Sequence, residues 1–282
     1  MKNVVVRSLT GALYVAVIVG AVLAGGWWMC ALCLLFGVLG VNELNRITNR
    51  NFMSNTTALL DLIGTVAVII CCYPYLWKSV NFLPPVLPIL GLIYFGYFIL
   101  RFIAQLYVQD GNALEHLSHS MLGQIYVVWP LALLEILHTG MGAYVVLSMF
   151  ILIWLSDTGA FCVGSLFGKH KLFERISPHK SWEGFFGGLV FCLIAGALLF
   201  YFFPGKLSGL NLWAMIGLGA VVCIFGTWGD LIESMIKRSL GVKDSGNILP
   251  GHGGILDRID SLLLVVPAVC FYLMVCAMAG WI

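Results

Sequence analysis

Long apolar runs recur from one end of this 282-residue chain to the other, and they decide what the chain can fold into. Apolar residues make up 61% of it and charged residues 10%, and its mean hydropathy is +0.99. Each run is near the roughly 20 residues that an α-helix needs to cross a bilayer. Backbone groups in lipid must bond within their own segment, so such runs form helices. The sequence therefore excludes a soluble domain and predicts an all-α, polytopic integral membrane protein with about nine spans, near residues 9–25, 27–42, 58–77, 83–104, 121–137, 142–164, 184–203, 211–233 and 262–282.

The positions of lysine and arginine predict how these spans are oriented. Cytoplasmic loops of membrane proteins carry an excess of both residues. With nine spans and a cytoplasmic N-terminus, 13 of the 15 lysines and arginines fall on the cytoplasmic side, and only Lys78 and Lys206 fall on the other. We therefore expect a cytoplasmic N-terminus and a periplasmic C-terminus.

The two halves of the chain differ in character. We predict that residues 1–140 form a transmembrane scaffold and residues 141–282 a catalytic region, within one continuous membrane domain. In the scaffold we expect a short cytoplasmic turn at Glu43 and residues 45–50, and a polar cytoplasmic connection over residues 101–120.

Two acids of the scaffold, Asp61 and Glu135, lie within or beside apolar spans. A charge at that depth costs about 2.5–3.5 kcal/mol on insertion scales. Three interpretations stay open for these acids: they line a cavity, they form hydrogen bonds between helices, or they are protonated.

The polar residues of the chain are concentrated in residues 226–261. A chain with so few charges has few places for polar chemistry, so we look for function in this stretch. Its ionisable residues are Asp230, Glu233, Lys237, Arg238, Lys243, Asp244, His252, Asp257, Arg258 and Asp260.

Helical spacing predicts how these residues are arranged. If the eighth span continues as a helix to Arg238, a step of about 100° per residue gathers its ionisable side chains and Ser234 in one arc. Gly241 then ends the helix, and Asp257 and Asp260 start the ninth span on one face. Carboxylates from two helices thus meet at one membrane boundary, with a glycine-rich loop between them whose N–H groups can approach a phosphate. Such oxygen ligands beside phosphate-reading cations suggest Mg²⁺ shared with a nucleotide polyphosphate.

Two further segments of the second half carry polar groups. Ser156 and Asp157 lie near the cytoplasmic end of the sixth span, and the basic loop 164–184 follows it. The end of that loop is predicted to start a helix, with Ser181 as N-cap and Glu183 in the first turn. Positive-inside topology with helix capping and phosphate binding both stay open as explanations of the loop.

Residues 234–260 closely resemble the signature of the bacterial phosphatidate cytidylyltransferase (CDP-diacylglycerol synthase) family. The Ser156-Asp157 helix end and the loop Ser177-Pro178-x-Lys180-Ser181-x-Glu183-Gly184 resemble other segments of that family, although His179 and Ser181 stand where lysine and threonine are more usual. The signature reads Ser234-x-Ile236-Lys237-Arg238-x₄-Lys243-Asp244-x-Gly246-x₂-Leu249-Pro250-x-His252-Gly253-Gly254-Ile255-x-Asp257-Arg258-Ile259-Asp260.

The resemblance implies a nucleotidyltransferase of phospholipid biosynthesis that converts CTP and phosphatidate into CDP-diacylglycerol and diphosphate. It implies Asp230 and Asp257 as ligands of Mg²⁺ and leaves open whether a monovalent ion joins it. The catalytic residues it implies are Asp230, Asp257, Asp260, Lys237 and Arg238. The substrate-binding residues it implies are Lys180, Ser181, Lys243, Asp244, His252, Gly253, Gly254, Arg258, Ser156 and Asp157. His252 either contacts phosphate or shapes its turn.

The implied substrates also set the expected surroundings. Phosphatidate stays in the bilayer and CTP is cytoplasmic, so we expect an active site at the cytoplasmic boundary of a bacterial inner membrane. The resemblance suggests a homodimer, and no nucleic acid is expected as a partner.

Two other functions stay open on the sequence. An ion-coupled transporter would use Asp157 and Asp230 to carry ions, although it predicts acids near the midplane in two related halves. A CTP-dependent membrane lipid kinase would transfer the γ-phosphoryl group and release CDP.

Overall fold

The computed structural model describes residues 2–48, 55–73, 86–109, 112–246, 248 and 253–281. Most of this part of the chain is helical, and one two-stranded sheet accompanies the helices. The elements in chain order are α1 (Lys2–Ala24), α2 (Gly26–Thr48), α3 (Asn55–Cys72), α4 (Val86–Leu106), α5 (Ala113–Gly123), the π-helical turn η2 (Gln124–Val128), α6 (Trp129–Met141), α7 (Ala143–Phe167), β1 (Lys171–Phe173), β2 (Ser177–Ser181), α8 (Trp182–Phe202), α9 (Leu212–Ser239) and α10 (Leu256–Met278).

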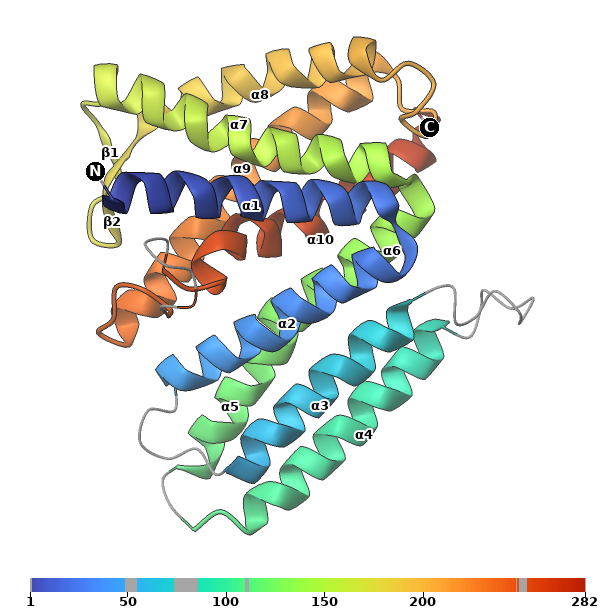
Figure 1. The fold of residues 1–282 in the computed structure, drawn as a ribbon, viewed down its shortest axis with the longest axis vertical. Helices are drawn as coiled ribbons and strands as arrows, with labels where there is room; N and C mark the ends of the chain where they lie inside the picture. The colour runs from blue at the N-terminus through green and yellow to red at the C-terminus, as the bar shows by residue number, and fades with distance from the viewer. Residues whose placement is uncertain are drawn as a thin grey trace. The chain divides into compact units, whose positions relative to one another are not determined.

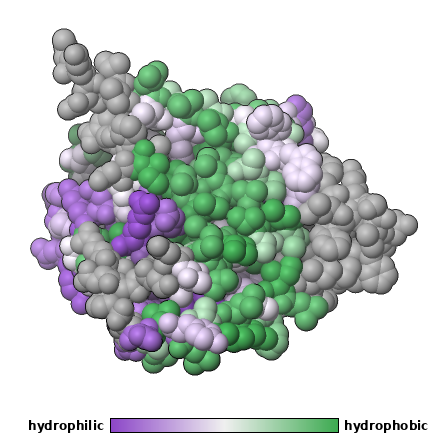
Figure 2. Space-filling view, turned by 60° about the horizontal axis from the view of Figure 1, so that its bottom comes forward, coloured by the Kyte–Doolittle hydropathy of each residue, from purple (hydrophilic) through white to green (hydrophobic). Residues whose placement is uncertain are grey.

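The helices overlap the predicted apolar runs, the fifth run being covered by α5, η2 and α6 in succession. Residues 74–77 of the third run, 83–85 of the fourth and 282 of the ninth lie outside the described residues. Within the described residues, six helical stretches are long and apolar enough to cross a membrane, and three apolar stretches, in α1, α3 and α4, are shorter. Hydrophobic residues cover much of the face in Figure 2, and large apolar side chains such as Phe161 and Phe202 are exposed. This is a nearly all-helical, multi-pass membrane protein.

Several helix ends follow from local sequence. The side-chain oxygen of Asn211 caps α9 by accepting a hydrogen bond of 2.9 Å from the backbone N–H of Ala214. Between α6 and α7 the chain turns at Gly142, whose φ of 79° suits glycine. Helix α9 continues to Ser239, and Gly241 follows it with a φ of 67°, so both predictions for this helix end are confirmed.

A β-hairpin between α7 and α8 corrects the all-α prediction. Strands β1 and β2 pair antiparallel, with Lys171 opposite Ser181 and Phe173 opposite Ser177. Phe173 also packs edge-on against Trp228 of α9, with 5.5 Å between the ring centroids. Strands this short show too few alternations for a period of two to be recognised in the sequence.

The predicted cytoplasmic turn at Glu43 is wrong, because α2 continues through it to Thr48. Leu44 and Ile47 are buried on this last part of the helix, and the side chains of Glu43 and Asn45 are buried as well. The helix keeps two polar side chains inside because each has hydrogen-bonding partners from other elements. Residues 49 and 50 of the predicted turn lie outside the described residues.

The predicted polar connection over residues 101–120 is also mostly helical. Helix α4 carries Arg101 and continues to Leu106, and α5 starts at Ala113. Asn112 caps α5 by accepting a hydrogen bond of 3.1 Å from the backbone N–H of Leu114. Arg101 is 3% exposed, so it is a buried partner of other side chains and not a loop cation.

The chain forms two compact units. The first unit comprises residues 1–136 and 244–259, and the second comprises residues 137–243 and 260–282. In the first unit α3 lies beside α4 and packs on α2, and in the second unit α7, α8 and α9 pack on one another (Figure 1). Helix α10 contributes its first turn to the first unit and the rest of its length to the second.

A buried polar cluster holds the helices of the first unit together. The carboxylate of Asp61 on α3 accepts hydrogen bonds from Tyr97 (2.7 Å), Ser120 (2.8 Å) and Asn45 (3.1 Å). The guanidinium of Arg101 lies 3.4 Å from the same carboxylate. Of the three interpretations left open for Asp61, hydrogen bonding between helices is the one observed.

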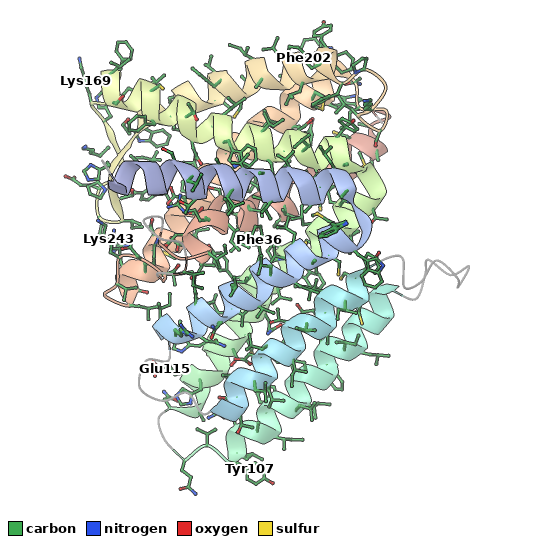
Figure 3. The ribbon with its side chains drawn as sticks, in the orientation of Figure 1. Phe36, Tyr107, Glu115, Lys169, Phe202 and Lys243 are labelled. Atoms are coloured by element: carbon green, nitrogen blue, oxygen red, sulfur yellow. The ribbon has the colours of Figure 1, made fainter. Side chains whose placement is uncertain are left out.

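Glycines bring the helices of the second unit into backbone contact. A methyl group on Gly188 of α8 would lie 2.9 Å from the backbone oxygen of Ser156 on α7, and one on Gly184 would lie 2.8 Å from that of Ala160. Gly219 of α9 approaches the backbone oxygen of Cys192 on α8 in the same way. Small residues allow this close approach between membrane helices. The resulting α7–α8 pair carries Lys169 at one end and Phe202 at the other (Figure 3).

Candidate active site

An ion pair between the hairpin and α9 is the centre of the polar site in the second unit. The ammonium nitrogen of Lys180, near the end of β2, lies 2.5 Å from Oδ2 of Asp230. The hydroxyl of Ser234, one turn further along α9, donates a hydrogen bond of 3.2 Å to Oδ1. The two charged side chains are 26% and 34% exposed, so both remain open to solvent.

Two more carboxylates belong to this site. Asp260 on α10 interacts electrostatically with Asp230, Asp157 and Lys180. Helices α9 and α10 come close together at this point, since a methyl group on Gly229 would lie 2.7 Å from the backbone oxygen of Asp260. The structure thus places Asp157, Asp230 and Lys180 close enough to Asp260 to interact with its charge. The charges of Asp230 and Asp157 repel that of Asp260, so the site favours a cation.

The carboxylates allow a test of whether the site fits Mg²⁺. Within the described residues, no three histidine, cysteine or acidic side chains are arranged to hold a metal on their own. Mg²⁺ often takes only one or two protein carboxylates and completes its shell with water and substrate phosphates. The half-exposed carboxylate of Asp230, with Asp260 beside it, fits a metal that arrives with a polyphosphate.

The basic end of α9 is engaged in contacts of its own. Lys237 forms an ion pair with Glu233 one turn earlier, and both side chains are nearly enclosed. Arg238 donates a hydrogen bond of 3.1 Å from Nη1 to the backbone oxygen of Val242, just beyond the helix end. The contacts seen for these two predicted catalytic cations therefore stabilise the end of α9.

Two predicted serines sit where α7 and α8 meet. The hydroxyl of Ser181 accepts a hydrogen bond of 3.2 Å from the backbone N–H of Gly184, so its predicted role as N-cap of α8 is confirmed. Ser156 is buried in α7, one residue before the exposed Asp157. The N-cap fixes the start of α8 directly after Lys180.

The signature loop, defined here as residues 244–256, belongs to the first unit together with Asp257. The carboxylate of Asp257 accepts hydrogen bonds from the backbone N–H groups of Ser245 (3.1 and 3.2 Å) and Gly254 (2.8 Å). A methyl group on Gly253 would lie 2.7 Å from Oδ2 of Asp257, and the φ of Gly253 is 85°. Asp257 therefore binds both described ends of the loop.

The remaining predicted residues lie at the surface or outside the described part. The side chains of Lys243, Asp244 and Arg258 are exposed. The backbone oxygen of Arg258 accepts a hydrogen bond of 3.0 Å from the hydroxyl of Tyr14. His252 lies outside the described residues.

Glu183 lies in the first turn of α8 as predicted, but the sequence did not reveal that Glu183 and Glu43 bind loops. Glu183 accepts hydrogen bonds from the backbone N–H groups of Lys169 (3.1 Å) and His170 (3.2 Å), and it lies 2.6 Å from Nδ1 of His170. Glu43 binds the signature loop from α2. The available signal for Glu43 was a carboxylate inside an otherwise apolar run.

Comparisons with known proteins agree with the family resemblance of residues 234–260. A model of the cytidylyltransferase family matches residues 5–276. The chain is 34% identical over 265 residues to a phosphatidate cytidylyltransferase of Staphylococcus haemolyticus, covering 93% of this chain and 96% of that protein. It is 34% identical over 263 residues to one of Staphylococcus epidermidis and 32% identical over 262 residues to one of Staphylococcus aureus, with the same coverage.

Proposed function

The chain belongs to the cytidylyltransferase family, and on that premise we propose that it is a nucleotidyltransferase that converts CTP and phosphatidate into CDP-diacylglycerol and diphosphate. The observation that carries this proposal is similarity along nearly the whole chain to proteins named phosphatidate cytidylyltransferase. The signature at residues 234–260 and the half-exposed pair of Lys180 and Asp230 support it.

In the proposed reaction a phosphate oxygen of phosphatidate attacks the α-phosphorus of CTP in line. A new P–O bond forms, the bond between the α-phosphorus and the bridging oxygen breaks, and diphosphate leaves with the electron pair. The attacking oxygen is already ionised, so catalysis rests on positioning and charge neutralisation and needs no strong base. Lys180 is suited to meet a phosphate because its ammonium group is partly open to solvent.

The metal is part of the same proposal. Mg²⁺ bound with CTP would neutralise charge on its phosphates. On the family resemblance we propose Asp230 and Asp257 as its ligands. In the second unit Asp260 lies beside Asp230 as a further carboxylate. The family resemblance also allows a monovalent ion to bind beside Mg²⁺.

The other residues implied by the family resemblance are proposed contacts of the substrates. Lys237, Arg238, Lys243 and Arg258 supply positive charge. The remaining proposed contacts are Ser156, Asp157, Ser181, Asp244, His252, Gly253 and Gly254. The exposure of Lys243, Asp244 and Arg258 is compatible with this role.

The proposed surroundings follow from the substrates and from the charge distribution. We propose nine spans, with the N-terminus in the cytoplasm and the C-terminus in the periplasm, in a bacterial inner membrane. The active site would then face the cytoplasm, where CTP meets the phosphatidate headgroup. A homodimer is part of the proposal through the family resemblance alone.

The deciding experiment uses the full chain in detergent with phosphatidate, Mg²⁺ and CTP carrying label at either the α- or the γ-phosphorus. We expect α-label in extracted lipid and γ-label in diphosphate, in equal amounts. Asp230→Asn should abolish the transfer, whereas Glu174→Gln, at an exposed acid of the hairpin, should leave it unchanged. Gamma-label in lipid would identify a lipid kinase instead. No transfer by folded wild-type protein would overturn the proposal and direct attention to ion transport.

A further inference from the structure

Glu43 is a carboxylate enclosed in the first unit, far along the chain from the signature. It lies on α2, five residues before the helix ends at Thr48, and its side chain is 2% exposed. A buried carboxylate is stable only where hydrogen bonds or charges compensate for the water that it has lost. Its partners therefore show what it is built to hold.

The three hydrogen-bond donors that contact Glu43 within the described residues all belong to the signature loop. Oε2 accepts hydrogen bonds from the hydroxyl of Ser245 (3.0 Å) and from the backbone N–H of Leu256 (2.9 Å). Oε1 accepts one of 2.9 Å from the backbone N–H of Ile255. Ser245 stands near the start of the loop and Ile255 near its end, so one side chain binds both ends.

The end of the loop is also the start of α10. Leu256 is the first residue of that helix. The first N–H groups of a helix have no partner within it, and they attract negative charge. Glu43 supplies both an acceptor and a charge to this helix start, although it comes from another helix.

The glycines of the signature fit the same arrangement. A methyl group on Gly246 would lie 2.5 Å from Oε1 of Glu43, and one on Gly254 would collide with Oε2. The N–H of Gly254 already donates to Asp257 at 2.8 Å. These two glycines therefore make room for the Glu43 carboxylate. For Gly254 this role is additional to the approach to phosphate that the sequence suggested for the loop at residues 250–254.

We propose that Glu43 is a positioning residue of the transfer reaction, which holds the two described ends of the signature loop, residues 244–246 and 253–256, so that Asp257 meets the substrates in one arrangement. This inference rests on the proposed function. Glu43 acts through the loop and not on substrate, because its carboxylate is enclosed and its acceptor positions are occupied by Ser245, Ile255 and Leu256.

The test compares Glu43→Gln with Glu135→Gln in the full chain. Glu135 is equally buried in the first unit, where its carboxyl group forms a hydrogen bond with the thiol of Cys33. It is therefore a matched control. Glutamine keeps the size of the side chain but turns an –NH₂ group toward N–H or O–H donors. Loss of a supporting partner of this kind typically lowers activity about 10–100-fold, and we expect that loss in kcat/KM for Glu43→Gln.

The division of this loss between KM and kcat separates positioning from simple destabilisation. A smaller folded fraction lowers the apparent kcat and leaves KM unchanged. A misplaced signature loop also raises KM for CTP, which we expect for Glu43→Gln but not for Glu135→Gln. Ser245→Ala should reproduce part of the effect, and its effect should not add fully to that of Glu43→Gln, since both remove the same hydrogen bond.

Hydrogen exchange provides a readout that needs no activity. In Glu43→Gln we expect faster exchange of the backbone N–H groups of Ile255 and Leu256 than in wild type, with the rest of α10 unchanged. Active wild type with an equally active Glu43→Gln would overturn the positioning role alone. Equal losses in both variants, without a change in KM, would also overturn it. Inactive wild type would instead overturn the proposed function, while exchange would still report whether Glu43 holds the loop.

Discussion

The ion pair of Asp61 with Arg101 and that of Asp230 with Lys180 use the same chemistry in opposite surroundings. The first pair is 2% and 3% exposed and is surrounded by hydrogen-bonding side chains of the first unit. The second pair, in the second unit, is 34% and 26% exposed and has two further carboxylates near it. An enclosed and fully bonded pair has nothing left to offer a substrate, whereas a half-open pair can exchange its partner for a phosphate or a metal. The comparison therefore distinguishes structural polar residues from those suited to chemistry.

The largest loss of stability is expected when the buried ion pair of Asp61 and Arg101 is broken. Asp61→Ala leaves the buried guanidinium of Arg101 without its carboxylate, and breaking a buried pair in this way costs about 3–5 kcal/mol. Unfolding of the detergent-solubilised protein, followed by circular dichroism, measures the loss. Asp61→Asn keeps an acceptor for Tyr97 and should cost less. A loss of under about 1 kcal/mol for Asp61→Ala would remove the contrast between the two pairs, because such values are typical of exposed pairs.

The half-open pair should respond in the opposite way. Lys180→Gln removes a cation placed to stabilise phosphate charge, a kind of loss that typically lowers kcat by about 10²–10³-fold. The free energy of unfolding of this variant should differ from that of the wild type by less than about 1 kcal/mol, since the pair is partly solvated.

Transfer of α-label from CTP to lipid and thermal unfolding, measured on the same preparation, check both parts of this prediction. Lys171→Gln, at an exposed lysine of the same hairpin, is the matched control and should keep its activity. Full activity of Lys180→Gln would show that exposure alone does not identify a substrate contact.

A smaller loss of stability is expected when the N-cap Ser181, which follows Lys180, is replaced. Ser181→Ala removes the acceptor for the N–H of Gly184, and loss of an N-cap costs about 0.5–2 kcal/mol. Ser181→Asn keeps a capping oxygen and should retain most of the stability. If alanine and asparagine behave alike in thermal unfolding, the cap does not fix the start of α8.

The sequence predicted the helices because each has an apolar run near the length of a membrane span. Local chemistry likewise predicted the N-cap at Ser181 and the helix end at Gly241, since the residues concerned are close neighbours. Arg101 was misplaced because its partner Asp61 is 40 positions earlier, and an apolar pattern alone does not reveal such pairing.

The candidate site was predictable only where a motif marked it. The family resemblance named Asp230, Asp257 and Asp260, and the structure brings Asp230 and Asp260 together in the second unit. Glu43 has no motif of its own. Its role depends on donors at the other end of the chain, so an isolated acid in an apolar run was read as part of a turn.

The separation between Glu43 and its partners also sets an order of events during biosynthesis. Ser245 follows Glu43 by 202 residues, and Leu256 follows it by 213. At about 5–20 residues per second, Glu43 is synthesised roughly 10–40 s before its first partner. Throughout that interval α2 carries a carboxylate that lacks all three of these donors. A chain released by a stalled ribosome before residue 244 would contain every helix from α1 to α9 and still lack residues 244–259 of the first unit, so that unit is complete only after these residues are synthesised.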